Sequence, residues 1–335
     1  MLIPKSEIKA AAARIRPHLA PTPLMRARYL SDQLGANVFL KLETLQPTHS
    51  FKVRGAFSAL TRLTRTQLAR GIVTASGGNH GLAMAYAAGK LGVPVTVYLP
   101  ESAIEAKLSA IRQLRANVVI FGAAWDDANA LAMKVATESG RAYIHPFDDP
   151  MVMAGQGTIV TELLKQLPDP DLIVASIGGG GLISGIASAV EHYAPGTRVF
   201  GVETEGADSM YQSYKAGRIV ELPAITSIAE TLGARKTEQT QFDIVMRYVT
   251  SLVCVSDNAA IRALIAILQE EKLLTEPAAA CSVAALVEGK IPVKSGENVV
   301  VVLCGANIAH EKIHEWEAAA RNLGTKAGRR RDEFK

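Results

Sequence analysis

The sequence is organised around residues 48–56, which read Thr48-His49-Ser50-Phe51-Lys52-Val53-Arg54-Gly55-Ala56. Lys52 follows a small hydroxyl residue and an aromatic residue, and it opens a run with helical spacing that extends to about residue 63. A lysine that forms covalent bonds must be withdrawn from water, because desolvation lowers its pKa and frees the amine as a nucleophile. Lysine is mostly exposed in proteins, so Lys52 taken alone is better interpreted as a surface residue at a helix start. Whether Lys52 is a reactive residue is decided by motifs elsewhere in the sequence.

Outward from this stretch, short apolar strands alternate with helix-like segments. We expect strands at 38–43, 72–75, 95–99, 118–121, 172–176, 199–202, 252–255 and 299–303. We expect helices at 6–16, 51–63, 81–91, 104–114, 127–139, 159–167, 183–192, 258–273 and 277–287. Such alternation is typical of mostly parallel sheets covered by helices on both faces. Two runs, at about 70–148 and 150–320, predict an α/β protein with two lobes.

Composition and charge exclude several classes of function. The chain has 335 residues and a formal net charge of +4. Residues 321–335 hold six basic and two acidic residues, a net charge of +4, so the body of the chain is neutral. A nucleic-acid surface is therefore not expected, and the basic end is expected to be a flexible tail.

Cysteine usage and hydropathy bear on the compartment. Cys254, Cys281 and Cys304 are scattered without a CxxC pair, which fits neither a disulfide framework nor a zinc site. The sequence does not begin with the charged and then apolar pattern of a signal peptide. It has no apolar run that approaches the roughly 18 residues a membrane-spanning helix needs. We expect a cytoplasmic protein that does not enter a membrane.

A glycine-rich loop follows the strand at 172–176. Residues 176–182 read Ser-Ile-Gly-Gly-Gly-Gly-Leu and open a helix, so several backbone N–H groups can converge on an anion such as a phosphate. A dinucleotide loop is a competing interpretation, but Glu203 is a poor candidate for the acidic residue that such a site needs about 20 residues later. A merely flexible glycine turn is the remaining alternative.

Two further strand ends carry polar groups. In the loop at 75–81, the N–H groups and Ser76 can hold a carboxylate, and Asn79 can donate to a phenolic or carbonyl oxygen. His80 alone is more often a capping or core residue than a catalyst. Cys304 follows the strand at 299–303, where a thiol is usually inert but can face a heteroaromatic ring. With Lys52 and the glycine loop, these groups fit pyridoxal phosphate better than a nicotinamide.

On these residues the chain resembles the tryptophan-synthase-β-like (fold type II) family of pyridoxal-phosphate enzymes, and within it the threonine and serine dehydratases and serine racemase. The shared segments run in family order to about residue 315 and lie at 41–43, 50–56, 78–81, 145–150, 154–158, 178–182, 201–203 and 305–307. The resemblance implies a large cofactor-binding domain at 1–69 and 148–320 and a small mobile domain at 70–147. It also implies a homodimer.

The resemblance implies a role for each matching residue. Lys52 is the Schiff-base lysine, and Phe51 packs beside the cofactor ring. Asn79 holds the ring hydroxyl, and Cys304 lies next to the pyridine nitrogen. Gly178, Gly179, Gly180, Gly181 and Leu182 bind the phosphate, and the substrate is received by Ser50, Ser76, Asn79 and His80.

Three positions depart from the family pattern. Racemases have a serine, the second acid/base, where this chain has Gly77, so poor racemisation is expected. The cation site of the racemases matches Glu203, Ala207 and Ser209 in this chain. Ser209 stands where the racemases have an Asp, although Asp208 is adjacent, so the site offers fewer charged oxygens than a divalent cation prefers. His49 stands where the family commonly has Gly, and it either contacts the substrate or is a tolerated loop residue.

The sequence thus predicts a pyridoxal-phosphate-dependent ammonia-lyase for a β-hydroxy-α-amino acid. Threonine and serine are the default substrates, and phenylserine and 3-hydroxyaspartate remain open. The alternatives are an amino-acid racemase, a β-replacement synthase, a nicotinamide-binding oxidoreductase and a cofactor-binding protein without catalysis.

Overall fold

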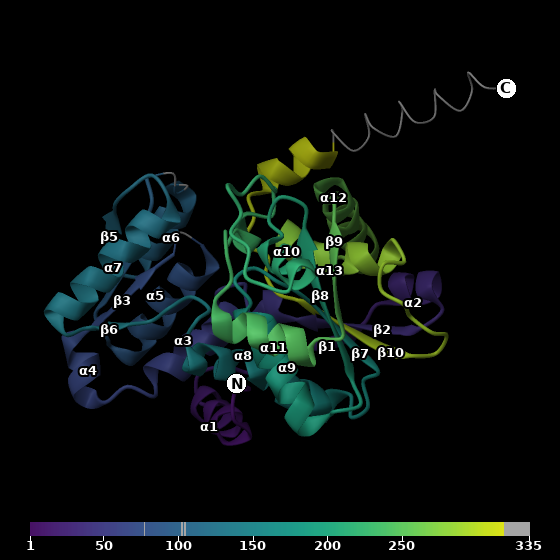
Figure 1. Cartoon of the computed structure of the whole chain (residues 1–335), viewed down its shortest axis with the longest axis horizontal. Coiled ribbons are helices and arrows are strands. Elements are labelled where there is room, and N and C mark those ends of the chain that lie inside the picture. Colours follow the sequence, from purple (N-terminus) through teal and green to yellow (C-terminus); the bar gives the residue numbers. More distant parts are fainter. Residues whose placement is uncertain (77, 102, 104, 318–335) are drawn as a thin grey trace.

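The computed structural model describes residues 1–76, 78–101, 103 and 105–317 (Figure 1). Gly77 and the basic tail at 321–335 lie outside the described residues. The chain forms two sheets, each flanked by helices, as Figure 1 shows with the smaller sheet at the left. The predicted α/β fold with two mostly parallel sheets is confirmed.

The larger sheet has six strands in the order β1-β2-β10-β7-β8-β9. β1 is antiparallel to β2 and the other neighbours are parallel. All residues of β7 are buried, as are all but the first of β10, which explains their continuous apolar sequences. The strands are β1 (Leu24–Arg26), β2 (Asn37–Leu42), β7 (Leu172–Ser176), β8 (Arg198–Thr204), β9 (Ser251–Val255) and β10 (Asn298–Leu303).

Alternate side chains of this sheet enter two different cores. Val300 and Val302 of β10 face a core shared with α1, α3, α8 and α9, whereas Val299 and Val301 face a core shared with α2, α12 and α13. This is the two-residue period of a strand that is covered on both faces. The helices are α1 (Lys5–Ile15), α2 (Arg28–Leu34), α3 (Lys52–Leu60), α8 (Pro150–Gln166), α9 (Gly181–Tyr193), α12 (Asp257–Ala266) and α13 (Pro277–Val287).

The smaller sheet is parallel throughout, in the order β5-β4-β3-β6. Its strands are β3 (Ile72–Ala75), β4 (Val95–Leu99), β5 (Asn117–Ile120) and β6 (Ala142–Tyr143). It carries α4 (Arg65–Arg70), α5 (Asn79–Leu91), α6 (Glu105–Gln113) and α7 (Trp125–Ser139). No helix in the described ranges is long and apolar enough to cross a membrane.

Differences from the predicted elements have local causes. The segment predicted as a helix from 159 begins at Pro150, because Asp149 caps it by accepting from the N–H groups of Met151 and Val152. The helix predicted at 258–273 ends at Ala266 and continues as a π-helical turn, Ile267–Glu271. The two shortest strands, β1 and β6, were not predicted. Neither were α10 (Ser209–Ala216) and α11 (Gln239–Tyr248), which follow the larger sheet's β8.

Candidate active site

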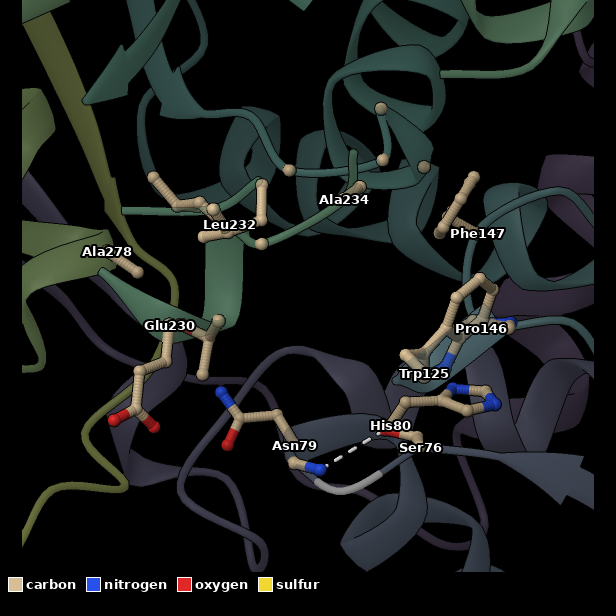
Figure 2. A pocket seen from close by; sticks show the side chains of 18 of the residues that line it. Ser76, Asn79, His80, Trp125, Pro146, Phe147, Glu230, Leu232, Ala234 and Ala278 are labelled. Carbon is tan, nitrogen blue, oxygen red and sulfur yellow. Dashed lines mark hydrogen bonds between the residues drawn. The ribbon is translucent and has the colours of Figure 1, made fainter. Parts of the chain in front are cut away.

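A cavity of about 630 Å³ lies where the two sheets meet, at the carboxyl ends of β3, β7 and β10 (Figure 2). Both lobes line it: Ser76, Asn79, His80 and Trp125 come from the smaller one, and Leu232, Ala234 and Ala278 come from the larger (Figure 2). Carboxyl ends of parallel strands are where open α/β sheets bind ligands. The predicted residues Lys52, Phe51, Leu182, Cys304 and Gly178–Gly181 also line this cavity.

Lys52 is the first residue of α3, and its side chain is half-buried. Its Nζ donates to the carbonyl oxygen of Pro146 at 2.8 Å. Burial lowers the pKa of Lys52 to about 8, against smaller opposing effects of Cys304 and Glu276. A substantial fraction of the amine is therefore neutral near pH 8, as a nucleophile and base requires.

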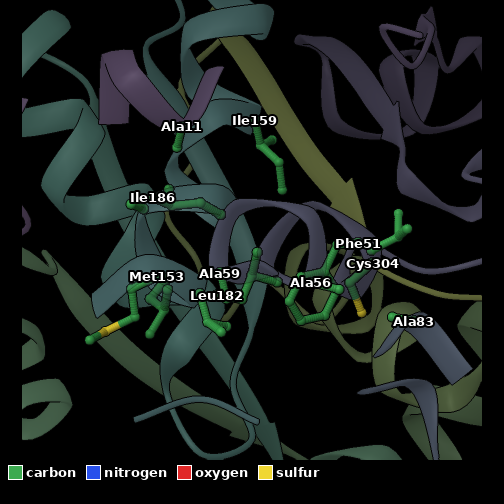
Figure 3. Packing of buried hydrophobic residues seen from close by; sticks show 14 of the residues in the cluster. Ala11, Phe51, Ala56, Ala59, Ala83, Met153, Ile159, Leu182, Ile186 and Cys304 are labelled. Carbon is green, nitrogen blue, oxygen red and sulfur yellow. The ribbon is translucent and has the colours of Figure 1, made fainter. Parts of the chain in front are cut away.

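The start of α3 is fixed by the core and by the end of β10. Phe51 N donates to the carbonyl of Cys304 at 3.0 Å, and Phe51 packs in the same core as Ala56, Ile159 and Ile186 (Figure 3). Two residues beyond Lys52, the buried Arg54 binds Glu43 through Nε and Nη2 at 2.7 and 2.8 Å. It also binds Glu162 through Nη1 at 3.0 Å. These contacts hold α3, and with it Lys52, against the larger lobe.

The glycine loop joins β7 to α9 and packs closely on its surroundings. A Cβ atom at Gly179 would lie 2.3 Å from the Phe147 ring, and one at Gly181 would lie 2.9 Å from Phe147. Gly180 has φ +94°, which favours glycine. The loop backbone thus borders the cavity directly at the N-terminus of α9, an arrangement that suits a phosphate.

Asn79 and His80 begin α5 on the opposite side of the cavity. Asn79 Nδ2 donates to Glu276 at 3.0 Å, and its Oδ1 accepts from Asn307 Nδ2 at 2.7 Å. His80 Nε2 lies 3.0 Å from Thr74 Oγ1. Burial lowers the pKa of His80 well below its usual value, helped by Lys52 and His145, so its imidazole is neutral at pH 7. Figure 2 shows Ser76 beside these residues, where its Oγ accepts from Gly78 N at 3.3 Å.

Cys304 ends the apolar run of β10 inside the cavity wall. Its Sγ lies 3.3 Å from Ser176 Oγ. Burial raises the pKa of the thiol to about 12, and Glu276 adds to this effect. Cys304 is therefore a neutral thiol at pH 7, and the described part of the chain leaves all three cysteines as free thiols.

The sequence did not predict Glu276, Thr231 or Trp125 as cavity residues. Glu276 is buried and immediately precedes Pro277 at the start of α13. An acidic residue before a proline at a helix start was the signal that could have identified it. Trp125 was expected in a loop, but it begins α7 and donates from Nε1 to the carbonyl of Ala75 at 3.0 Å.

Two predicted substrate residues do not line the cavity. His49 is exposed, with φ +52°, which explains why a glycine suits this position. Its backbone carbonyl accepts from Ala306 N at 2.9 Å, and its Nδ1 lies 3.4 Å from the carbonyl of Thr44. Ser50 is buried and pairs through its backbone with Gly305, so it anchors the segment that carries Lys52.

The predicted cation residues lie around the start of α10, away from the cavity lining. Glu203 is buried and accepts from the backbone N–H groups of Met210 and Tyr211. Burial raises the pKa of this carboxyl well above its usual value. Ser209 Oγ donates to the carbonyl of Ala234 at 2.8 Å, and Ala207 is buried. Within the described ranges, no group of three or more His, Cys, Asp or Glu side chains could hold a metal ion.

The cavity fits pyridoxal phosphate on the evidence of its own residues. Lys52 offers an amine with a lowered pKa, and the loop Gly178–Gly181 is a cradle whose space any side chain at Gly179 or Gly181 would fill. Cys304 and Ser176 offer neutral partners for a ring nitrogen. Lys52 would hold the aldehyde carbon and the glycine loop the phosphate.

Comparison with known proteins agrees with this assignment. Residues 15–305 match the model of a family described as pyridoxal-phosphate dependent enzyme. The chain is 41% identical over 307 residues to L-threonine ammonia-lyase of Geobacter sulfurreducens, covering 92% of this chain and 76% of that protein.

Solved structures share the fold over nearly the whole chain. Maize serine racemase superposes with a TM-score of 0.88 at 31% identity, covering 96% of this chain and 98% of the other. The processed form of threonine deaminase isoform 2 from Solanum lycopersicum superposes with a TM-score of 0.87 at 32% identity, covering 95% and 89%. The chain belongs to the family of pyridoxal-phosphate dependent enzymes of fold type II, and pyridoxal phosphate is its cofactor.

Proposed function

We propose that this protein is an ammonia-lyase that converts a β-hydroxy-α-amino acid, by default threonine or serine, to a 2-oxo acid and ammonia. The observation that carries the proposal is the half-buried Lys52 amine, with a pKa of about 8, set between the glycine loop and the start of α5. The similarity to an L-threonine ammonia-lyase and to a threonine deaminase supports the same reaction class.

Substrate binding and proton transfer would be carried out by different residues of the cavity. The N–H groups at the start of α5, with Ser76, Asn79 and His80, would bind the substrate carboxylate. Pyridoxal phosphate, when bound through Lys52, supplies an electron-withdrawing ring that acidifies the Cα–H bond of the substrate. Once the substrate amine has taken its place, Lys52 Nζ would accept the Cα proton as general base and then give it to the departing β-hydroxyl, which leaves as water. The released unsaturated amine takes up one water, which balances the water lost, and yields the 2-oxo acid and ammonia.

A neutral partner for the ring nitrogen favours elimination. Cys304 is a neutral thiol, so it would not fully protonate a ring nitrogen beside it. With Cys304 as its partner, bound pyridoxal phosphate would withdraw electrons less strongly than it would beside a charged partner. Loss of a β-leaving group is then the favoured outcome.

A racemase is the second candidate, because maize serine racemase shares the fold over 98% of its chain. Racemisation needs an acid on the face of the substrate opposite Lys52. The resemblance puts that group at residue 77, which is glycine here and lies outside the described residues. A residue without a side chain cannot move a proton, and this supports the lyase over the racemase.

Release of 2-oxo acid by the purified protein with added cofactor tests the proposal. L- and D-threonine, L-serine, phenylserine and 3-hydroxyaspartate are the substrates, and their enantiomers are followed in parallel. Oxo acid from one of them is the expected result and identifies the substrate. Enantiomer exchange without oxo acid would establish a racemase, and a loaded protein that transforms none of them would be a cofactor-binding protein without this activity.

The proposal extends to the substrate range, metabolic role, location and oligomeric state of the protein. Serine dehydration, a role in amino-acid catabolism, a cytoplasmic location and a homodimer are supported by the sequence resemblance. We also propose that residues 70–147 form a small mobile domain over a large cofactor-binding domain at 1–69 and 148–320. The cavity between the two sheets supports this division, because a domain that moves there would admit the substrate.

A further inference from the structure

We propose that Glu276 is a positioning residue that fixes the orientation of Asn79 and ties it to Thr231 in the opposite cavity wall. The proposal concerns the cofactor site itself. It depends on cofactor binding but not on the identity of the substrate. A failure of the lyase proposal would therefore leave it open to its own test.

Three donors from three separate segments converge on the Glu276 carboxylate. Asn79 Nδ2, at the start of α5, lies 3.0 Å from Oε1 and 3.3 Å from Oε2. Thr231 Oγ1, in the 3-10 turn Glu230–Leu232, donates to Oε1 at 2.8 Å. The backbone N–H of Asn307, beyond β10, donates to Oε2 at 3.2 Å. A carboxylate is acceptor-only, so it satisfies all three donors at once.

The orientation of the Asn79 amide follows from its two neighbours. Its Oδ1 accepts from Asn307 Nδ2, which also donates to the carbonyl of Thr48 at 2.9 Å. Its Nδ2 faces Glu276. A flipped amide would place oxygen against a carboxylate on one side and N–H against N–H on the other. The network therefore selects one orientation, with the Nδ2 group directed at the Glu276 carboxylate.

Burial makes this arrangement rigid and energetically important. Glu276 is 3% exposed and Asn79 is 7% exposed. A Cβ atom at Gly305 would lie 2.7 Å from Glu276 Oε1, so the carboxylate rests directly on the Gly305 backbone. Each hydrogen bond to a buried charged group contributes strongly, and loss of the charge leaves its donors unsatisfied.

The charge of Glu276 also acts on the cofactor-binding groups. It favours the protonated form of Lys52 and the neutral form of Cys304. Thr231 brings a second connection, because the turn that carries it includes the cavity residue Leu232 and is followed by Ala234 and Arg235, which also line the cavity. The carboxylate thus joins the start of α5 in the smaller lobe to a wall segment of the larger lobe.

Glu276→Gln, Thr231→Val and Thr231→Ser in the cofactor-loaded protein test the proposal, with Glu191→Gln as a matched control. Glu191 is exposed near the end of α9, so it receives the same chemical change away from the site. The readouts are the pH titration of the visible absorbance of the bound cofactor, kcat and KM separately, and the melting temperature.

Glu276→Gln removes a charge that favours protonation at Lys52, so the midpoint of the titration should move to lower pH. Its kcat should fall by about tenfold or more, because a hydrogen bond to a buried charge is replaced by a donor–donor contact. Thr231→Val should change the titration midpoint and kcat in the same directions as Glu276→Gln, but by smaller amounts. Thr231→Ser keeps the hydroxyl donor and should match the wild type in both. Glu191→Gln should match the wild type.

A structural role alone would lower the melting temperature and leave the titration midpoint and kcat of the loaded protein unchanged. That result in Glu276→Gln would overturn the proposal. If Glu276→Gln does not fold, Thr231→Val decides, since it keeps the carboxylate and replaces one hydroxyl donor with a methyl group of similar size. Absorbance and kcat equal to the wild type in that variant would also overturn the proposal.

Discussion

Arg235 of the larger lobe reaches across the mouth of the cavity to Asp126 of the smaller lobe, with Nη1 3.3 Å from Oδ2. Nη2 of the same guanidinium binds Glu221 at 2.8 Å, and its Nε donates to the carbonyl of Leu222 at 3.0 Å. The side chains of Arg235 and Asp126 are each more than a third exposed to solvent. An exposed pair of this kind contributes at most about 1 kcal/mol, so it restrains the two lobes without locking them.

Asp126→Asn should therefore loosen the lobes without affecting the chemistry at Lys52. We expect KM to rise by up to about fivefold with kcat nearly unchanged, because about 1 kcal/mol of closure is lost. High salt should remove the difference from the wild type, since it screens the pair. Steady-state kinetics at low and high ionic strength measure this effect. Glu105→Gln breaks an even more exposed pair, with Arg112, inside the smaller lobe and should leave KM unchanged.

Lys52→Ala should abolish turnover and the visible absorbance of bound cofactor together. In the proposed function Lys52 provides both the covalent attachment and the base, and loss of a positioned base alone costs about a hundredfold to ten-thousandfold in rate. Absorbance after dialysis and product release under saturating substrate measure the two losses. Lys9→Ala, at an exposed position of α1, is the control. Turnover in Lys52→Ala would rule out the assigned role.

The sequence predicted the groups whose signal is local and left out those that long-range packing brings in. Lys52 and Gly178–Gly181 stand in recognisable strand-to-helix contexts. Glu276 lies 197 residues from Asn79 in the chain, and only the folded arrangement of α13 and α5 makes them partners. Arg235 and Asp126 are 109 residues apart and lie in segments without a motif. Conversely, His49 departs from the family pattern in the sequence, yet its backbone conformation, not its side chain, explains the preference for glycine there.

Gly179→Ala should weaken cofactor binding through a steric effect on Phe147. The new Cβ would lie 2.3 Å from the ring, which real Cβ contacts do not reach, so the ring or the loop must move. Overpacking of this kind costs about 1–3 kcal/mol, so the dissociation constant of the cofactor should rise by about fivefold or more. Titration of the apoprotein with pyridoxal phosphate measures it. Gly196→Ala, where nothing lies within 4 Å of a Cβ, is the matched control and should bind normally.

His80 and His145 should make the protein less stable as the pH falls below about 6.5. Burial lowers the pKa of His145 to about 4 and that of His80 well below its usual value. Between the unfolded value of about 6.5 and the folded value, the unfolded chain binds protons that the native protein does not. The free energy of unfolding therefore falls as pH decreases, by at most about 1.4 kcal/mol per pH unit for each histidine, and the loss ends below the folded pKa.

Urea unfolding between pH 7.5 and 4.5 measures how the free energy of unfolding depends on pH. The variant His145→Asn separates the contribution of this histidine from the contributions of carboxyl groups. Glu203 has a raised pKa, so it acts in the opposite direction and stabilises the native protein as the pH falls. His145→Asn removes one titrating imidazole and should flatten the loss of stability below pH 6.5 relative to the wild type. Equal slopes for His145→Asn and the wild type would show that His145 takes up its proton equally in the folded and unfolded chains.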